Sequence, residues 1–370
     1  MKIGTVREIK KQEYRVGLTP ACVRAYVKRG HEVIVETGAG INAGFGNDEY
    51  RRAGATIEPN RNAVFDACDM IVKVKEPQPE EIQHFRENQI LYTYLHLAAS
   101  KALTLALMEK KIKAVAYETI ETRDGVLPCL VPMSEIAGRL AIQEGAKYLE
   151  RTFGGRGILL GGVPGVRRGK VAILGAGVVG TNACKIATGI GADVFILDVN
   201  ARRLAYLDDV FGSSINTLYS NDANLEMVLQ EADVVIGAVL RHGAKTPKLI
   251  LREHLQFMKK GAVIVDVAVD QGGCCETTHP TTHDNPIYTV EDIVHYAVAN
   301  MPGAVALSST IALTSATLEY GLKIAEHGPE NACQHDAAIG RGLNLYHGHC
   351  VYATIARDLE IEYTDADTLL

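Results

Sequence analysis

The stretch Val171-Ala-Ile-Leu-Gly-Ala-Gly-Val-Val-Gly180 decides the fold of this chain. A strand-like run, Val171–Leu174, is followed by the pattern G-x-G-x-x-G and then by a helix-like segment, Thr181–Thr188. In this pattern the first glycine permits a tight turn, the second lets the backbone approach a pyrophosphate, and the third lets helix and strand pack closely. The helix N-terminus adds free N–H groups and the positive end of its dipole. The motif therefore predicts a dinucleotide-binding strand-turn-helix unit.

The residues that follow this motif bear on the choice of dinucleotide. A second strand-like run ends at Asp198, where a carboxylate accepts hydrogen bonds from both ribose hydroxyls. The same negative charge repels the 2′-phosphate of NADP. Arg202 and Arg203 follow closely and leave a phosphate contact open, although they suit the solvated face of a helix equally well. The spacing favours NAD as the cofactor.

Apolar, β-rich runs recur on both sides of the motif and alternate with helix-like stretches such as Pro20–Arg29 and Lys101–Lys110. Strands that are apolar on both faces and alternate with helices are typical of a parallel sheet covered on both sides. The chain therefore predicts two successive α/β units. The strands expected in the first unit are Lys2–Val6, Glu32–Glu36, Met70–Lys75, Gln89–His96 and Ala114–Glu118. Those expected in the second unit are Val171–Leu174, Asp193–Asp198, Asp233–Leu240 and Ala262–Val267.

The join between the two units is expected near Pro128–Ser134. Ser134 suits the N-cap of one long helix that runs to Arg151, and a second long helix is expected over Ser309–His327. We expect these helices to link the domains and the tail after Val305 to pack back on the N-terminal unit. The predicted domains are residues 1–130 together with 306–370, and residues 131–305.

Composition narrows the class of protein. The chain has 370 residues, is 47% hydrophobic, and carries 38 basic and 44 acidic residues, so its net charge is −6. This is too apolar for a disordered chain, and the absence of a basic run argues against nucleic acid. No uninterrupted apolar run suggests a membrane span, and the charged start lacks a signal-peptide core. Eight cysteines without a CxxC pair suit a reducing compartment. We therefore expect a cytoplasmic protein.

Three polar residues follow apolar runs where ligands of open parallel sheets collect. Lys75 closes one run, His96 closes the next, and Asp270 comes just after Val263–Val269. A cation, an imidazole and a carboxylate placed there are suited to a shared cleft. Each also has an ordinary structural interpretation: Lys75 as a solvated strand end, His96 as a hydrogen-bonded core histidine, and Asp270 as a turn residue.

Several segments together resemble the L-alanine dehydrogenase family. They are Glu13–Val16, Lys73–Pro77, Leu95–Ser100, Pro132–Glu135, Gly161–Val166, Asp270–Gly273 and Ala299–Pro302. The resemblance runs from Met1 to the last helix. It implies two Rossmann-like α/β domains with parallel sheets that flank an interdomain cleft, linked by long helices and assembled as a homo-hexamer. It also implies reversible oxidative deamination of L-alanine to pyruvate and ammonium, with NAD bound by the middle segment.

The resemblance implies roles for individual residues. Arg15 matches the anchor of the substrate carboxylate, and Lys75 matches the lysine that polarises the carbonyl or imine. His96 matches the general acid/base, and an imidazole suits that task near neutral pH. Asp270 matches the carboxylate of the cleft. Met133 and Asn300 resemble residues that line the substrate pocket.

The cofactor contacts form a larger expected set, drawn from the glycine motif and the resemblance together. It comprises Ser134, Gly175, Gly177, Val178, Val179, Gly180, Asp198, Arg203, Ser220, Val239, Leu240, Val267, Asp270, Val298 and Met301. One departure is His279, where some family members have arginine, so a contact of His279 with the cofactor stays open.

Other readings stay open at this point. A transhydrogenase NAD-binding subunit shares the family, a saccharopine-type dehydrogenase shares the chemistry, and a catalytically inactive NAD sensor shares the cofactor. His347, His349 and Cys350 do not fit a standard zinc spacing, so no metal is expected. The vicinal pair Cys274-Cys275 is read as part of a buried turn.

Overall fold

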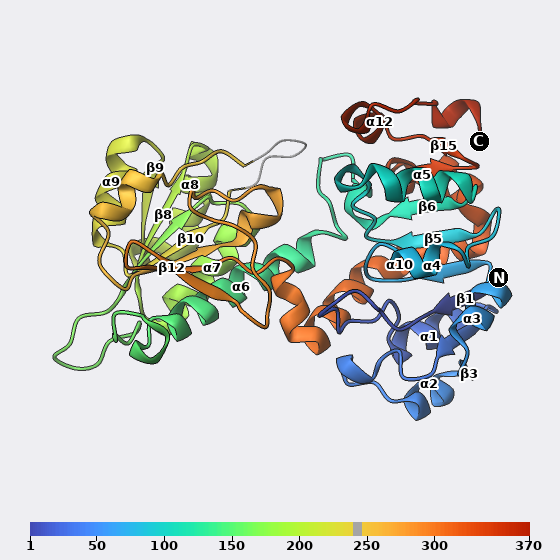
Figure 1. Ribbon diagram of the computed structural model, residues 1–370, viewed down its shortest axis with the longest axis horizontal. Helices are drawn as coiled ribbons and strands as arrows, with labels where there is room; N and C mark the ends of the chain where they lie inside the picture. The colour runs from blue at the N-terminus through green and yellow to red at the C-terminus, as the bar shows by residue number, and fades with distance from the viewer. Residues whose placement is uncertain (240–245) are drawn as a thin grey trace. The chain divides into compact units, whose positions relative to one another are not determined.

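The computed structural model describes residues 1–239 and 246–370 and divides the chain into two compact units (Figure 1). The first unit comprises Met1–Met133 and Gly303–Leu370, and the second comprises Ser134–Pro302. Each unit is built on its own β-sheet with helices packed against it. The two sheets are mostly parallel, which confirms the predicted α/β class. Leu240, one of the expected cofactor contacts, lies outside the described residues.

The sheet of the first unit combines strands from both ends of the chain. Its strands are β1 (Lys2–Thr5), β2 (Glu32–Glu36), β3 (Thr56–Glu58), β4 (Met70–Val72), β5 (Ile90–Thr93), β6 (Lys113–Ala116), β14 (Leu343–Tyr346) and β15 (His349–Cys350). Their order is β15-β14-β6-β5-β4-β1-β2-β3. β1 to β6 pair in parallel, whereas β14 is antiparallel to β6 and β15 is antiparallel to β14. The C-terminal strands therefore complete the sheet that the N-terminus begins.

Helices from both ends of the chain also enclose this unit. They are α1 (Pro20–Lys28), α2 (Asn47–Ala53), α3 (Arg61–Ala67), α4 (Pro79–Ile82), α5 (Lys101–Glu109), α10 (Ala306–His335), α11 (Ala337–Gly342) and α12 (Ala353–Leu359). One hydrophobic core contains Val6, Ile71 and Leu91 from the first part of the chain and Leu345 and Ile355 from the last. The expected return of the tail onto the N-terminal unit is confirmed.

The long helix α10 belongs to the core of the first unit. Among the described residues, the segment Met301–His335 has the length and composition of a membrane-crossing helix. Its buried face, however, makes polar contacts within the unit. The Thr310 hydroxyl accepts a hydrogen bond from the backbone N–H of Val16 at 3.3 Å, and the backbone carbonyl of Thr317 accepts one from the Tyr92 hydroxyl at 2.9 Å. The helix is interrupted at Gly328, whose φ of 76° is not helical. Packing inside this unit accounts for its apolar character.

The second unit contains the glycine motif. Its strands are β7 (Lys170–Leu174), β8 (Asp193–Asp198), β9 (Ile215–Tyr219), β10 (Val234–Gly237), β11 (Val263–Asp266), β12 (Ile287–Val290) and β13 (Ile293–Tyr296), in the order β12-β13-β11-β10-β7-β8-β9. Its helices are α6 (Val131–Tyr148), which belongs to this unit from Ser134 on, α7 (Val178–Ile190), α8 (Ala201–Phe211) and α9 (Asp222–Glu231). Only the β12–β13 pair is antiparallel among the strand pairings of this sheet's described residues.

The third glycine of the motif is required by the approach of α7 to β7. A Cβ at Gly180 would lie 1.8 Å from the carbonyl oxygen of Gly175 and 3.3 Å from the side chain of Ile173. Any larger residue would push the helix away from the sheet. The role assigned to Gly180 from sequence therefore has a direct steric basis.

Several predicted element ends were wrong. β4 ends at Val72 and β5 at Thr93, so Lys75 and His96 lie in the turns that follow these strands rather than at their ends. His96 has a left-handed backbone, with φ of 48°, which ends any extended strand. Ser134 lies inside α6, which begins at Val131, and does not cap it. Proline at the second helical position, Pro132, suits this earlier start because the first turn needs no N–H donor.

A buried cluster of charges fixes the chain just beyond β4. The ammonium of Lys73 is fully buried and lies 3.1 Å from Glu8 and 2.9 Å from Glu81. Burial acts to lower the pKa of Lys73, but the two carboxylates outweigh it and hold this pKa above its ordinary value. Glu8 also accepts hydrogen bonds from the backbone N–H groups of Val74 at 2.6 Å and Lys75 at 3.4 Å. The cluster therefore sets the backbone that presents Lys75.

Two glycine substitutions within α7 test the packing of this helix on the second sheet. Gly180→Ala is expected to lower the free energy of unfolding by about 2 kcal/mol or more, because the backbone must move to admit the methyl group. Gly189→Ala is the matched control: its Cβ would meet nothing within 4 Å, and alanine favours a helix. Thermal unfolding compares the two, and a Gly180→Ala variant as stable as the parent would contradict this packing.

Substitution of Lys73 tests the charge cluster. Lys73→Met leaves two carboxylates buried together without their cation, so we expect the free energy of unfolding to fall by about 3–5 kcal/mol. Chemical denaturation measures this change. Lys260→Met removes the same charge from an exposed pair with Asp292 and should leave stability unchanged. Equal effects of the two substitutions would show that Lys73 does not hold this part of the first unit together.

Candidate functional site

Three of the residues expected to bind substrate, Arg15, Lys75 and Met133, lie in the first unit, and Arg15 is the more deeply buried of the two cations. Arg15 is 2% exposed, and its Nε and Nη2 donate to the two carboxylate oxygens of Glu13 at 2.7 and 2.5 Å. Its Nη1 lies 3.1 Å from the sulfur of Met133, a second expected site residue. Burial acts to raise the pKa of Glu13, but hydrogen bonds and charge from Arg15 hold it at about 2. The guanidinium is therefore held in a fixed orientation.

Lys75 and His96 are brought together in the turns that follow the neighbouring strands β4 and β5. The Nζ of Lys75 lies 3.4 Å from Nε2 of His96. Burial lowers the pKa of Lys75, and the positive charges of Arg15 and Lys10 lower it further. An ammonium with a lowered pKa beside an imidazole is suited to proton exchange with a bound carbonyl compound. The contact was not predicted; only the placement of both residues at one sheet edge was.

Two carboxylates of this unit were missed by the sequence interpretation. Glu13 holds Arg15, and Glu118 accepts a hydrogen bond from the backbone N–H of His96 at 2.6 Å. Glu118 lies two residues after the end of β6, so the signal that singled out Lys75 and His96, a polar residue after an apolar run, was present for it as well. Glu13 offered no such signal because it lies in the loop after β1.

The glycine turn of the second unit fits a dinucleotide. Gly175 has a φ of 105°, and a Cβ there would lie 3.1 Å from the backbone nitrogen of Val239. A Cβ at Gly177 would meet nothing within 4 Å, so the space above the turn is open. α7 begins at Val178, and Val178 and Val179 stand in its first turn, where a helix leaves N–H groups without intrahelical partners. Open space beside free donors is what a pyrophosphate requires.

Asp198, the last residue of β8, and Arg203 on α8 both form hydrogen bonds with this turn. One oxygen of Asp198 accepts from the backbone N–H of Ala176 at 2.6 Å, and the other accepts from Asn200 at 2.7 Å. Arg203 donates through Nε and Nη2 to the Ala176 carbonyl oxygen at 3.0 and 2.9 Å. Ser220 donates its backbone N–H to the Asp198 carbonyl oxygen at 3.0 Å. Arg203 therefore contacts the turn itself instead of reaching outward as a phosphate ligand.

Two expected site residues of the second unit, Asp270 and Asn300, meet at the turn after β11. Asp270 is exposed there, and its Oδ2 accepts from the backbone N–H of Asn300 at 3.4 Å. Asn300 has a left-handed backbone with φ of 63°. Val298 and Met301 on either side of Asn300 are buried. Four further expected contacts are partly buried: Ser134 on α6, Val179 on α7, Val239 after β10 and Val267 after β11.

His279 is engaged within the second unit. Its ring stacks on Tyr288 with centroids 3.8 Å apart, and its backbone N–H donates to the Tyr288 hydroxyl at 2.9 Å. The ring and the backbone of His279 therefore both contact Tyr288 inside the second unit.

Cys274 and Cys275 form part of the turn that supports β11. Both backbone N–H groups donate to Asp266, at 2.9 and 3.1 Å, and both side chains are buried. Burial raises the pKa of both thiols. All eight cysteines of the chain lie in the described ranges, where they are buried and free. The two cysteines therefore have a structural setting.

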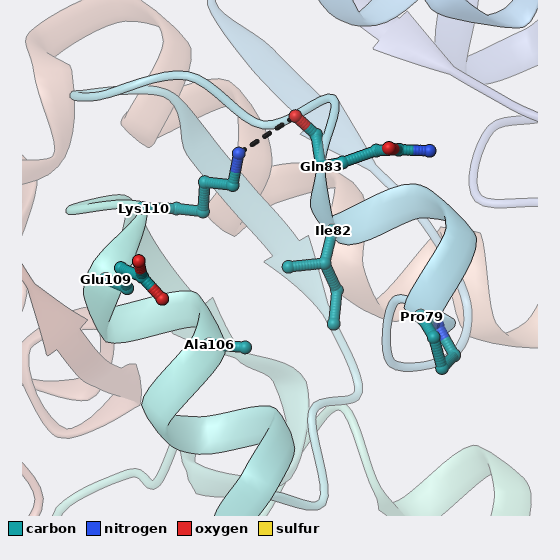
Figure 2. A pocket seen from close by; sticks show the side chains of 6 residues that line it. All are labelled: Pro79, Ile82, Gln83, Ala106, Glu109 and Lys110. Carbon is teal, nitrogen blue, oxygen red and sulfur yellow. Dashed lines mark hydrogen bonds between the residues drawn. The ribbon is translucent and has the colours of Figure 1, made fainter.

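A separate pocket of about 490 Å³ lies on the first unit between α4 and α5. It is lined by Pro79, Ile82, Gln83, Ala106, Glu109 and Lys110 (Figure 2). Lys110 donates through Nζ to the backbone carbonyl of Gln83 at 2.9 Å across its edge. None of these residues belongs to the expected site. In residues 1–239 and 246–370, no group of three His, Cys, Asp or Glu side chains has the arrangement of a metal site.

Comparison with known proteins agrees with the resemblance seen in sequence. Residues 4–137 match the family model described as "Alanine dehydrogenase/PNT, N-terminal domain", and residues 141–353 match the corresponding C-terminal domain. Alanine dehydrogenase of Methanococcus maripaludis is 53% identical over the full length of both chains. That of Bacillus subtilis is 54% identical, covering 100% of this chain and 98% of the relative.

Solved structures agree with the observed architecture. An L-alanine dehydrogenase matches with a TM-score of 0.95 and 51% identity, covering 97% of this chain and 99% of that one. A transhydrogenase from Sinorhizobium meliloti matches with a TM-score of 0.81 and 22% identity, covering 95% and 99%, which shows a shared fold. With both family domains and full-length relatives above half identity, the chain belongs to the alanine dehydrogenase/PNT family.

Proposed function

We propose that this chain is an NAD-dependent alanine dehydrogenase that converts L-alanine reversibly to pyruvate and ammonium. The observation that carries the proposal is the 3.4 Å contact of Lys75 with His96, in the unit that also buries Arg15. Relatives named alanine dehydrogenase, 51–54% identical over the full chain, support it. In this proposal the unit Met1–Met133 with Gly303–Leu370 binds the substrate, and Ser134–Pro302 binds the cofactor.

The substrate-binding residues divide the work by charge. Arg15, held by Glu13, is assigned the alanine carboxylate, because a guanidinium stays charged and offers paired donors. Lys75 is assigned the carbonyl or imine that develops at Cα. Met133 and Asn300 are assigned to the walls of the substrate pocket. Uncharged walls beside two cations suit a small amino acid with an apolar side chain.

Proton transfer is assigned to His96. The bound zwitterion must first lose a proton from its ammonium group, and NAD, when bound, would supply the acceptor for the hydride from Cα. His96 is assigned the proton of the water that adds to the iminium, and it returns that proton to the nitrogen as the carbinolamine divides into pyruvate and ammonium. Asp270 is assigned to orient the amino group and the water through its exposed carboxylate. The protein supplies alignment of the reacting atoms and a charged frame for the zwitterion.

The preference for NAD rests on Asp198. Its carboxylate stands at the end of β8, where it suits ribose hydroxyls and repels a 2′-phosphate. Arg203 donates to the Ala176 carbonyl oxygen in the turn and to the Thr181 hydroxyl on α7. The proposed cofactor contacts are those expected from the sequence, and the open side of Gly177 supports the place of the pyrophosphate.

Assembly and location complete the proposal. We assign a homo-hexamer in the cytoplasm, with small molecules as partners and neither nucleic acid nor a membrane. Leu159, Val163 and Val166, on the glycine-rich loop before β7, are exposed apolar side chains that suit contact with another subunit. Eight buried free thiols suit a reducing compartment.

A substrate panel tests the proposed activity against its alternatives. The purified chain is expected to oxidise NADH with pyruvate plus ammonium and to form NADH from L-alanine, both followed by the absorbance of the reduced nicotinamide. Turnover with lysine and 2-oxoglutarate instead would support a saccharopine-type enzyme. Exchange with another nucleotide alone would support a transhydrogenase subunit, and binding without turnover would support a sensor.

Substitution of Asp198 tests the choice of cofactor. Asp198→Ala is expected to lower the ratio of kcat/KM for NAD to that for NADP by about tenfold, because a charged contact to the ribose and a repulsion of the 2′-phosphate are both lost. The ratio is the proper measure because the substitution also removes the acceptor for Ala176, which affects both cofactors. Asp193→Ala, at the opposite end of β8, is the control. An unchanged ratio would show that another group reads the ribose.

A further inference from the structure

His96 has a backbone conformation that needs support. Its φ of 48° and ψ of 37° lie in the left-handed region, which side chains with a Cβ rarely adopt. His96 stands at the N-cap of a short 3-10 turn, Leu97–Ala99, and its own side chain makes no capping hydrogen bond. Such a conformation persists where neighbouring groups hold it. The direction of the imidazole therefore depends on what fixes this turn.

Glu118, in the turn that follows the adjacent strand β6, supplies that support. Its Oε1 accepts from the backbone N–H of His96 at 2.6 Å and from that of Leu95 at 3.0 Å, and its Oε2 lies 3.2 Å from the same Leu95 nitrogen. β5 and β6 pair in parallel, with Thr93 opposite Ala116, so both strands end at the same edge. The short turn after β6, Tyr117–Thr119, then brings the carboxylate beneath the turn of His96.

The charges that face His96 are unequal. Lys75 approaches its Nε2 to 3.4 Å, Lys10 adds a second positive charge, and Glu76 and Glu118 are the opposing carboxylates. The ring of Tyr94 stacks beside the imidazole at 6.0 Å between centroids. Burial lowers the pKa of His96, Glu118 acts to raise it, and Lys75 lowers it again. Glu118 is the strongest of the charges that favour the imidazolium.

We propose that Glu118 is a positioning residue for His96. The carboxylate of Glu118 fixes the left-handed turn at His96 and supplies the negative charge that balances Lys75. This inference rests on the proposed alanine dehydrogenase reaction, in which His96 moves the protons. Glu118 acts through His96 and is assigned no contact with substrate. Its hydrogen-bonding role and its charge can be separated, because one oxygen accepts from both backbone N–H groups.

Glu118→Gln isolates the charge. A glutamine whose oxygen takes the place of Oε1 keeps the acceptor for Leu95 and His96 but is neutral. Without the carboxylate the imidazolium is less favoured, so the pKa of His96 falls. The acid limb of kcat for alanine oxidation, where neutral His96 is the base, should then move to lower pH by about half to one unit. Saturating alanine removes the titration of free alanine from this limb, because kcat reports the groups of the enzyme–substrate complex.

Glu118→Ala removes both contributions. With no acceptor the turn at His96 relaxes, and kcat is expected to fall about 10- to 100-fold, whereas NADH binding measured by fluorescence stays unchanged. Glu118→Gln should recover most of this loss at the pH optimum. Full activity of Glu118→Ala would overturn the positioning role, and an acid limb that does not move in Glu118→Gln would overturn the role of the charge.

Controls separate this inference from the proposed function. Glu58→Gln makes the same chemical change in a carboxylate that also accepts a backbone N–H, that of Asn60 at 2.8 Å. Glu58 lies on β3, an outermost strand of the same sheet. Its pH profile should match that of the parent. Thermal unfolding verifies that each variant is folded. A parent protein inactive with alanine would overturn the proposed function, whereas an active parent with unaltered Glu118 variants would overturn this inference alone.

Discussion

The parallel pairing of β4, β5 and β6 is the constraint on which the candidate substrate site depends. Met70 lies opposite Ile90, and Ile90 lies opposite Lys113, so the three strands run side by side in one direction. Their carboxyl ends therefore share one edge, and each is followed shortly by a titratable residue: Lys75, His96 or Glu118. An antiparallel strand at this place would send one of these groups to the opposite edge. The parallel direction of the three strands is therefore what brings these titratable residues to one end of the sheet.

Much of the architecture could be predicted because it rests on local patterns. Apolar runs predicted the strands, and the glycine spacing predicted the turn before α7. The close approach of helix and strand at Gly180 leaves no room for a Cβ beside the carbonyl oxygen of Gly175. Element ends were less predictable because distant groups decide them. β4 stops at Val72 where Glu8, far away in sequence, begins to take the backbone N–H groups. α6 starts before Ser134 although serine is a favoured cap.

The partners of the expected site residues were beyond prediction for the same reason. Residue types suggest that Arg15, Lys75 and His96 bind or transfer charge, but they do not say which carboxylate neutralises or holds each one. Glu13 is two residues from Arg15, yet the loop geometry that pairs them is set by the fold. Glu118 meets His96 across neighbouring strands. Side-chain pairing between separate elements is a tertiary property, and it sets the pKa values on which the proposed reaction depends.

The return of the tail to the first sheet has a consequence for synthesis on the ribosome. β14 pairs with β6, and Leu345 and Ile355 complete a core begun by Val6. The N-terminal segment emerges early but lacks its last strands until nearly the whole chain has been translated. The second unit, by contrast, is continuous in sequence and has every strand of its sheet once Pro302 has emerged. Nascent domains fold as units, so the order of folding should be inverted relative to the order of emergence.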